Sequence, residues 1–317
     1  MVFACGKLVR GLELEWGGGS VLPCDVTDVL RYRLVALDLD GTTLDPMGRV
    51  SQRTRQAIMN LVRRGVYVCF ATGRNYTESL RVLEACQHFA KAVFVGGATV
   101  VEAKPTREAC TLLRSVTMQP DLARELSADL ESMGHAVLAL QEAFTSGVDY
   151  VVTDGITLDA ATSKWMELTH AKVKFQPNLG GYSHENTLRV GIVAATERTR
   201  EVNRLLAEKY GSRVVTHAIA VPPQAVEVVE VFDPGVNKWA GVSFVAESVG
   251  VSGEEVIAVG DDLNDLAMLH GAGLGVAMGN GRAEAKRAAK LTIGTNAQDG
   301  LAEFLEKMMT EDRVAAA

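Results

Sequence analysis

Two aspartates, Asp38 and Asp40, lie one residue apart in the stretch ALDLDGTTLD (36–45), where an apolar run ends. Residues i and i+2 of a β-strand share a face, so both carboxylates can point the same way as the strand ends. Gly41 permits the sharp turn that exposes them. Carboxylates in such a place can act as a nucleophile, as a proton carrier or as ligands of a cation.

A second acidic turn follows a late apolar run, EVIAVG (255–260), and contains Asp261 and Asp265. If the late strand lies beside the early one, four carboxylates reach one edge of a sheet. They would repel one another strongly unless positive charge lies between them. Oxygen ligands with open coordination positions suit Mg²⁺, which usually keeps waters and binds a substrate phosphate as well. The pattern therefore indicates a Mg²⁺ site.

Partners for anionic oxygens occur in two further motifs. ATGR (71–74) follows another apolar run and offers the Thr72 hydroxyl and the Gly73 amide. Lys238 opens a helix pattern, where backbone N–H groups also favour an anion. A lone DxD often caps a turn or lies on a solvated surface, but the four motifs together are far more specific.

The elements that position these motifs alternate between strand and helix patterns. Apolar runs at 34–40, 66–71 and 92–98 are separated by helix patterns, and the rhythm returns at 255–260 and 273–278. This order predicts an α/β fold with a doubly wound, Rossmann-like parallel sheet, whose sites lie at the carboxyl ends of the strands.

A different pattern interrupts the alternation. Helix patterns at 121–133 and 197–210 lie among several strand-like runs, which predicts an inserted α+β domain with an antiparallel sheet. The first 30 residues show no clear periodicity and no signal-peptide order. The expected domains are an N-terminal extension (1–30), a catalytic core (31–116 with 223–317) and a cap (117–222).

Composition narrows the class of protein. The 317 residues carry a net charge of −7 and are 47% apolar, which is typical of a globular protein with a full core. The acidic balance argues against a nucleic-acid partner. No apolar run is long enough for a transmembrane helix. Five scattered cysteines without CxxC spacing indicate reduced thiols, so we expect a cytoplasmic protein. Together with the charge and the lack of a transmembrane run, this predicts a protein that binds neither membrane nor nucleic acid.

The four motifs, DLDGTT, ATGR, Lys238 and VGDDLND, resemble those of the haloacid dehalogenase-like hydrolases. The layout is similar to the Cof-type branch of phosphatases, which has a large α/β cap of type IIB. The resemblance covers about 31–310 of the chain. It implies Mg²⁺-dependent hydrolysis of phosphate monoesters through an aspartyl-phosphate.

The resemblance also implies roles for individual residues. Asp38 takes the position of the nucleophile and Asp40 that of the general acid and base. Asp265 matches a carboxylate that supports the metal ligands from outside. The implied metal ligands are Asp38, Asp40 and Asp261. The implied phosphate-binding residues are Leu39, Thr72, Gly73, Lys238 and Asn264.

These residue types fit the chemistry. Asp38 must be ionised to attack phosphorus, and a cation shields its charge from that of the phosphate. Asp40 gives a proton to the leaving oxygen and then takes one from the water that splits the acyl phosphate. Thr72, Lys238 and backbone N–H groups meet the charge on the equatorial oxygens.

Some features differ from the family pattern. Gly96-Gly97 stands where Asn-Gly is more usual, Trp239 follows the motif lysine in place of a small residue, and Asp262 adds an acid beside Asp261. We expect Trp239 to pack in the core, with a substrate contact as the alternative. Asp262 is either a solvated neighbour or part of the site.

Other functions compete with a phosphatase. A phosphomutase of the same superfamily and a non-catalytic phosphoryl-binding protein remain open. A signalling receiver domain is disfavoured by the DxDGT order and by the insert. A cap over the strand ends would exclude water and leave room only for a small leaving group. The expected partner is a small phosphorylated metabolite, first a sugar phosphate and second a phosphorylated cofactor such as a flavin or pyridoxal phosphate.

Overall fold

The computed structural model describes residues 32–315 except 159, 161, 164–165, 167–170 and 222–225. The predicted extension at 1–30 lies outside the described residues. The chain divides into two compact units, and each is described by itself. The first joins the chain up to Val68 to the chain from Ala246, and the second is Cys69–Val245.

The first unit is built on a sheet with the strand order β14-β13-β12-β1-β2. Strands β1, β12, β13 and β14 pair in parallel, as predicted. All four residues of β1 are buried apolar side chains, which is typical of a strand that is covered on both faces. The strand bounds are β1 Leu34–Leu37, β2 Tyr67–Phe70, β12 Val256–Gly260, β13 Leu274–Ala277 and β14 Leu291–Thr292.

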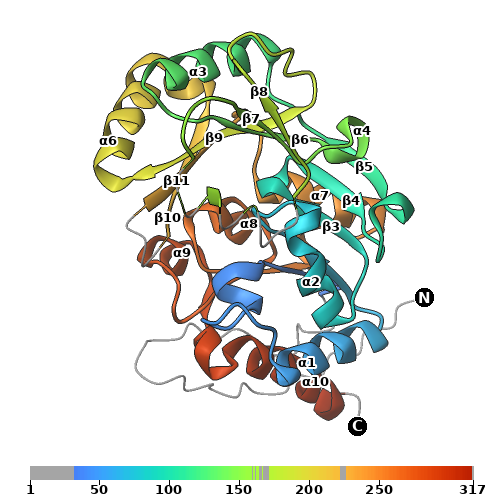
Figure 1. Ribbon diagram of the computed structural model, residues 1–317. Coiled ribbons are helices and arrows are strands. Elements are labelled where there is room, and N and C mark those ends of the chain that lie inside the picture. Colours follow the sequence, from blue (N-terminus) through green and yellow to red (C-terminus); the bar gives the residue numbers. More distant parts are fainter. Residues whose placement is uncertain are drawn as a thin grey trace, which may run out of the picture. The chain divides into compact units, whose positions relative to one another are not determined.

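The longer helices of this unit, α1 (Gln52–Arg63) and α10 (Gly300–Ala315), lie side by side (Figure 1). Ser51 caps α1 by accepting a hydrogen bond from the backbone N–H of Thr54. Short helical segments lie between the strands of the sheet, and some of them contain residues of the acidic turns. They are the π-helical turn Leu39–Thr43, the 3₁₀ turns Gly253–Glu255, Leu263–Asp265 and Asn296–Gln298, α8 Leu266–Gly271 and α9 Ala283–Ala288.

The second unit contains a three-stranded antiparallel sheet, β3-β4-β5, in addition to a larger sheet. Helix α7 packs so closely on β3 that a Cβ at Gly241 would collide with Val93. The bounds are α2 Tyr76–Cys86, β3 Lys91–Phe94, the 3₁₀ turns Val95–Gly97 and Arg107–Ala109, β4 Thr99–Glu102, β5 Thr111–Ser115 and α7 Lys238–Ser248.

The larger sheet has six strands in the order β10-β11-β9-β6-β7-β8. Helices α3 and α6 cover one of its faces (Figure 1). Residues such as Val190 and Val229 pack on that face with Leu126 of α3. The bounds are α3 Pro120–Ser132, β6 Leu138–Gln141, α4 Ala143–Ser146, β7 Tyr150–Thr153, β8 Val173–Gln176, β9 Thr187–Ala195, α6 Thr196–Leu205, the turns Leu206–Tyr210 and Gly211–Arg213, β10 Val215–Val221 and β11 Val226–Phe232.

Two details of strand pairing differ from the prediction. The third strand of the expected parallel series, β3, pairs antiparallel with β4 and has only a parallel bridge, Ala71 with Val93, on its other side. The six-stranded sheet is mixed, because β7 and β8 are parallel. Apolar patterns reveal that strands exist, but partners far along the chain decide their direction.

The six-stranded sheet also continues past the predicted cap limit at 222. Strand β11 pairs with both β9 and β10. The predicted domain limits themselves stay a prediction. Among the described residues, no helix combines the length and the apolar character that a membrane crossing requires.

Candidate active site

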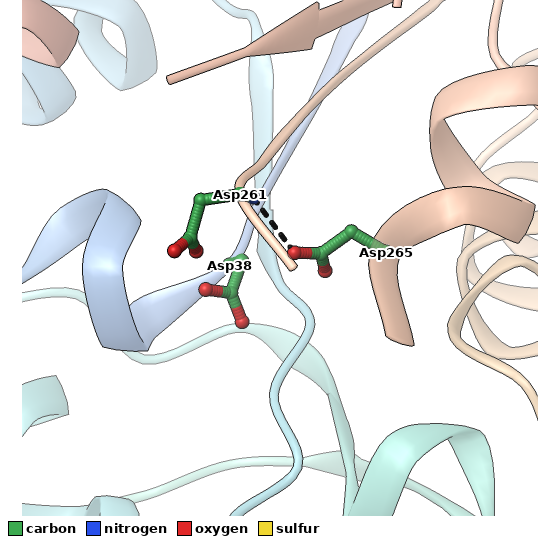
Figure 2. A group of neighbouring side chains, drawn as sticks. All are labelled: Asp38, Asp261 and Asp265. Carbon is green, nitrogen blue, oxygen red and sulfur yellow. Dashed lines mark hydrogen bonds between the residues drawn. The ribbon is translucent and has the colours of Figure 1, made fainter. Parts of the chain in front are cut away.

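Three carboxylates converge in the first unit, as Figure 2 shows. Asp38 follows β1, Asp261 follows β12, and Asp265 ends the turn after β12. The ligand oxygens of these three residues lie within 4.8 Å of one another. Asp38 and Asp265 are buried, with 4% and 0% of their surface exposed. Like charges gathered at this depth repel one another, and a group of three carboxylates in this arrangement could hold a metal ion.

Parallel pairing explains why the first two carboxylates meet. Leu37 lies opposite Val259 in the register of β1 and β12. The backbone N–H of Asp38 donates to the carbonyl of Val259 at 3.0 Å, so the ladder continues one residue beyond the strand. The residues that follow each strand therefore leave the sheet together, as the position of sites in α/β sheets leads one to expect.

The turn after Asp38 fits closely around Asp261. Gly41 has φ 79°, and a Cβ at that position would collide with the Asp261 carboxylate. Thr42 Oγ1 donates to Asp261 Oδ1 at 3.1 Å, and Thr43 Oγ1 donates to the carbonyl of Asp38 at 2.6 Å. Glycine is needed here for both conformation and space, and the two hydroxyls hold the turn against the acids.

Asp265 is fixed by the backbone of its own turn. Its Oδ2 accepts hydrogen bonds from the N–H groups of Asp261 at 2.8 Å and Asp262 at 3.0 Å. Asp262 in turn accepts from the N–H of Leu263 and pairs with Arg282 at 2.7 Å. The added acid at 262 thus caps the turn and forms an ion pair.

The predicted site residues of the first unit differ in solvent exposure. Asp40 is exposed, Leu39 is fully buried and Asn264 is partly buried. Because β1 ends at Leu37, the alternation of strand faces does not extend to Asp40. The carboxylate cluster contains Asp265 and not Asp40, which was predicted as a metal ligand. The carboxylate oxygens of the cluster suit Mg²⁺.

Two asparagines that the sequence reasoning missed hold the same turn. Asn280 Nδ2 donates to the carbonyl of Gly41 at 2.8 Å, and Asn296 Nδ2 donates to that of Leu44 at 2.8 Å. The backbone N–H of Asn296 also donates to Asn280 Oδ1 at 2.9 Å. Both asparagines follow strands of the sheet, β13 and β14. Their position at strand ends was the signal that could have revealed them.

In the second unit, the loop that carries Thr72 is anchored by its backbone to the end of β3. The N–H of Thr72 donates to the carbonyl of Val93, and its carbonyl accepts from the N–H of Gly96, both at 2.9 Å. Its hydroxyl oxygen accepts from the N–H of Arg74 at 3.1 Å. Thr72 is fully buried and Gly73 partly buried.

Lys238, the first residue of α7, is 1% exposed. Asn237 caps this helix by accepting from the N–H of Ala240 at 2.9 Å. A Cβ at Gly97 would collide with the carbonyl of Asn237. The unusual pair Gly96-Gly97 therefore contacts both the Thr72 loop and the start of α7, and glycine at 97 permits that approach.

The structure also shows the surroundings of Trp239 and of three cysteines. Trp239 is half-buried and is not a core residue. The described cysteines, Cys69, Cys86 and Cys110, are not in disulfide bonds. Burial raises the pKa of the Cys69 thiol to about 12, so it stays protonated at neutral pH.

Nine residues were predicted to form one site, and six of them belong to the first unit and three to the second. The structure gathers Asp38, Asp261 and Asp265 in one unit. It places Thr72, Gly73 and Lys238 in the other. Their union in a single site stays a prediction.

Residues 35–305 match the family of haloacid dehalogenase-like hydrolases. A phosphatase of Bacillus subtilis, the 5-amino-6-(5-phospho-D-ribitylamino)uracil phosphatase YitU, is 33% identical over 86% of this chain and 96% of its own length. The HMP-PP phosphatase of Cronobacter sakazakii is 30% identical over 78% of this chain and 84% of its own. The solved structure of a HAD subclass IIB sugar phosphatase, BT4131, matches with a TM-score of 0.68 at 19% identity, covering 87% of this chain and 98% of that one.

The chain therefore belongs to the haloacid dehalogenase-like hydrolases. The predicted family, the predicted α/β fold class with a Rossmann-like core and a cap, and the predicted enzyme class, a phosphoric monoester hydrolase, are confirmed.

Proposed function

We propose that this chain hydrolyses a small phosphate monoester in the presence of Mg²⁺, through a phosphoryl group carried on Asp38. The observation that carries the proposal is the convergence of Asp38, Asp261 and Asp265 within 4.8 Å. A cluster of three carboxylates needs a cation, and a nucleophilic carboxylate at its edge can attack a phosphate whose charge that cation shields.

Asp38 forms a bond from a carboxylate oxygen to phosphorus, and the bond from phosphorus to the leaving oxygen breaks. Asp40 gives its proton to that oxygen, so an alcohol departs. It then takes a proton from water, which attacks the aspartyl-phosphate and releases inorganic phosphate. The exposure of Asp40 suits a group that exchanges protons with water. Bound Mg²⁺, held by Asp38 and Asp261 with Asp40 as a further predicted ligand, would neutralise negative charge on the phosphoryl oxygens.

The phosphate oxygens are assigned to the predicted donors. Thr72 offers a hydroxyl and Lys238 a cation at the start of α7. Leu39 and Gly73 offer backbone N–H groups, and Asn264 offers an amide. Asp265 supports the metal ligands, since its carboxylate accepts from the N–H of Asp261.

The substrate class is a small phosphorylated metabolite, a sugar phosphate or a phosphorylated cofactor. Support comes from relatives, one named for a phosphorylated ribityl compound and one for HMP-PP. The net charge of −7 gives no attraction for nucleic acid. A cytoplasmic location remains a prediction.

The test is a turnover assay on the purified protein, with p-nitrophenyl phosphate and then with a panel of sugar phosphates and phosphorylated cofactors. We expect release of inorganic phosphate with Mg²⁺ and loss of activity in chelator. Equal turnover without metal contradicts the mechanism. A phosphomutase would instead return the phosphoryl group to a second position on the sugar, which phosphorus NMR of the products distinguishes. Absence of both turnover and transfer would favour a binding protein.

A further inference from the structure

A buried ion pair lies on the six-stranded sheet of the second unit. Arg189 of β9 and Glu230 of β11 are 2.5 Å apart, and their side chains are only 10% and 8% exposed. Arg189 lies opposite Phe232 in the strand register, so Glu230 is its diagonal neighbour on the same face. Residues on the alternate face of the same strands, such as Val190 and Val231, pack with the helices. The ion pair therefore lies on the face away from α3 and α6.

Stability alone does not account for this pair. Desolvation of two charges offsets most of their attraction, and apolar residues of similar size often serve the fold as well. Burial raises the pKa of Glu230, while the neighbouring Arg189 acts to lower it. The pKa of Arg189 is itself raised by Glu230 and its neighbours, so the two charges attract each other while burial opposes the ionised carboxylate. The contacts of Arg189 show what else the pair does.

The guanidinium of Arg189 reaches one particular segment. Its Nη1 donates to the carbonyl of Gly73 at 3.4 Å, and its Nη2 donates to the hydroxyl of Tyr150 at 3.2 Å. Tyr150 in turn donates to Glu78 Oε1 at 2.9 Å, and the other oxygen of Glu78 accepts from the N–H of Asn75 at 2.9 Å. Both branches end on residues 73–78, the loop after β2 and the first turn of α2.

One peptide unit connects Arg189 to Thr72. The carbonyl of Gly73 and the N–H of Arg74 belong to the same planar peptide group. The carbonyl accepts from Arg189, and the N–H donates to Thr72 Oγ1 at 3.1 Å. With its oxygen accepting that bond, the Thr72 hydroxyl has its own proton to donate elsewhere. The orientation of this peptide plane therefore sets the orientation of the hydroxyl.

We propose that Arg189 is a positioning residue, which holds the Gly73–Arg74 peptide so that the Thr72 hydroxyl donates to the substrate phosphate. This inference rests on the proposed function, because it assigns phosphate binding to Thr72. The inference also gives the six-stranded sheet a role, because a residue of β9 then holds the loop that carries Thr72 in the same unit. Glu230 and Tyr150 orient the guanidinium, whose planar fork a lysine cannot reproduce.

The experiment compares variants in kcat, in KM for p-nitrophenyl phosphate, and in the inhibition constant of inorganic phosphate. Arg189→Met is made together with Glu230→Gln, so that no carboxylate is left buried without its partner. We expect this pair to raise both KM and the inhibition constant, and to lower kcat/KM by about 10- to 100-fold. Arg189→Lys should retain only a small part of the phosphate affinity that the arginine provides. Glu230→Gln alone keeps the guanidinium but removes the charge that orients it, so its phosphate affinity should fall between those of the wild type and of the double variant.

A double-mutant cycle separates positioning from stability. Thr72→Val should weaken phosphate binding, and adding the Arg189→Met and Glu230→Gln changes to it should cost little more, because residues that act through one another are not additive. A purely structural role would lower the melting temperature, leave the inhibition constant of the folded protein unchanged and give additive losses. An unchanged inhibition constant or additive losses would overturn the inference. A Thr72→Val variant with normal phosphate affinity would also overturn it.

The matched control is Arg213→Met. This arginine belongs to the same unit, but its side chain is 51% exposed and pairs with Glu125 at 2.9 Å. The variant should leave kcat/KM at the wild-type value. An active wild type with unaffected Arg189 variants overturns this inference alone. A wild type without turnover overturns the proposed function, and this inference with it.

Discussion

Two regions of this chain bury charge in opposite ways. In the first unit, Asp38, Asp261 and Asp265 bring charges of one sign within 4.8 Å. In the second unit, Arg189 faces Glu230 at 2.5 Å on the six-stranded sheet, and Arg107 pairs with Asp149, which directly precedes β7. The second arrangement pairs opposite charges, whereas the first gathers charges of one sign.

The difference separates a reactive site from a scaffold. A carboxylate that must attack phosphorus has to stay ionised and unblocked, so its charge is better met by a cation that also binds substrate. A guanidinium that orients a peptide has to stay in one place, and a fixed carboxylate holds it there. Loss of the reacting carboxylates in the first region should therefore affect turnover most, and changes in the second region should affect it less.

Removing the nucleophilic charge should have the largest effect. Asp38→Asn is expected to lower kcat by about 10⁴-fold or more, because an amide lacks the attacking anion. The melting temperature should hold or rise, since one of three repelling charges is gone. Steady-state kinetics and thermal melting measure both. Asp45→Asn is the control, because that carboxylate pairs with Arg49 at 3.0 Å. Wild-type rates in the Asp38 variant would place the nucleophile elsewhere.

Loss of the proton carrier should come next. Asp40→Asn is expected to lower kcat by about 10²- to 10⁴-fold, the range of general acid–base catalysis. The loss should be greater for an alkyl phosphate than for p-nitrophenyl phosphate, whose leaving group needs little protonation. Rates for the two substrates check this. Unchanged kinetics with both would rule out the assigned role.

Cation binding should be visible in stability. Mg²⁺ at a hundredfold excess over its dissociation constant is expected to stabilise the wild type by about 2.7 kcal/mol. Asp261→Asn should lose most of that gain, and Asp45→Asn should keep it. Thermal melts with and without Mg²⁺ provide the measurement. A gain that persists in the Asp261 variant would move the site away from the carboxylate cluster.

The asparagine that holds the nucleophile turn should have a moderate effect. Asn280→Ala removes the hydrogen bond to the Gly41 carbonyl. We expect kcat to fall by roughly tenfold through misplacement of the turn, and stability to fall by about 1 kcal/mol. Kinetics and denaturant unfolding report the two. Asn60→Ala, on the surface of α1, is the control, and equal behaviour of both variants would remove Asn280 from this role.

The smallest effect is expected in the pH dependence of unfolding, to which Glu230 of the balanced pair contributes. Burial raises the pKa of Glu230 above its usual value. Its contribution to stability is thus fully present below about pH 4.5 and is lost as the pH rises through the folded-state value. The melting temperature of the wild type relative to Glu230→Gln should therefore decrease as the pH rises from about 4.5 through the folded-state pKa. A relative increase over that range would mean that the pair stabilises the fold.

Much of the fold follows from local pattern. Short apolar runs that end in Asp38, Thr72 and Asp261 indicate strands of a parallel sheet and the edge where their motifs lie. The helix at 121–133 corresponds to α3 (Pro120–Ser132). These features depend on residues that are close in the chain, so the sequence reveals them.

The sequence alone determined the two acidic turns, the strand that precedes each of them and the glycine that permits the sharp turn at position 41. Only the tertiary structure decided which carboxylates meet. Asp265 joins Asp38 because parallel pairing of β1 with β12 brings their following turns together, while Asp40 lies beyond the strand and is exposed. Asn280 and Arg189 reach Gly41 and Gly73 across more than a hundred residues of chain. Local propensity contains no information on such long-range contacts, because packing of the whole sheet sets them.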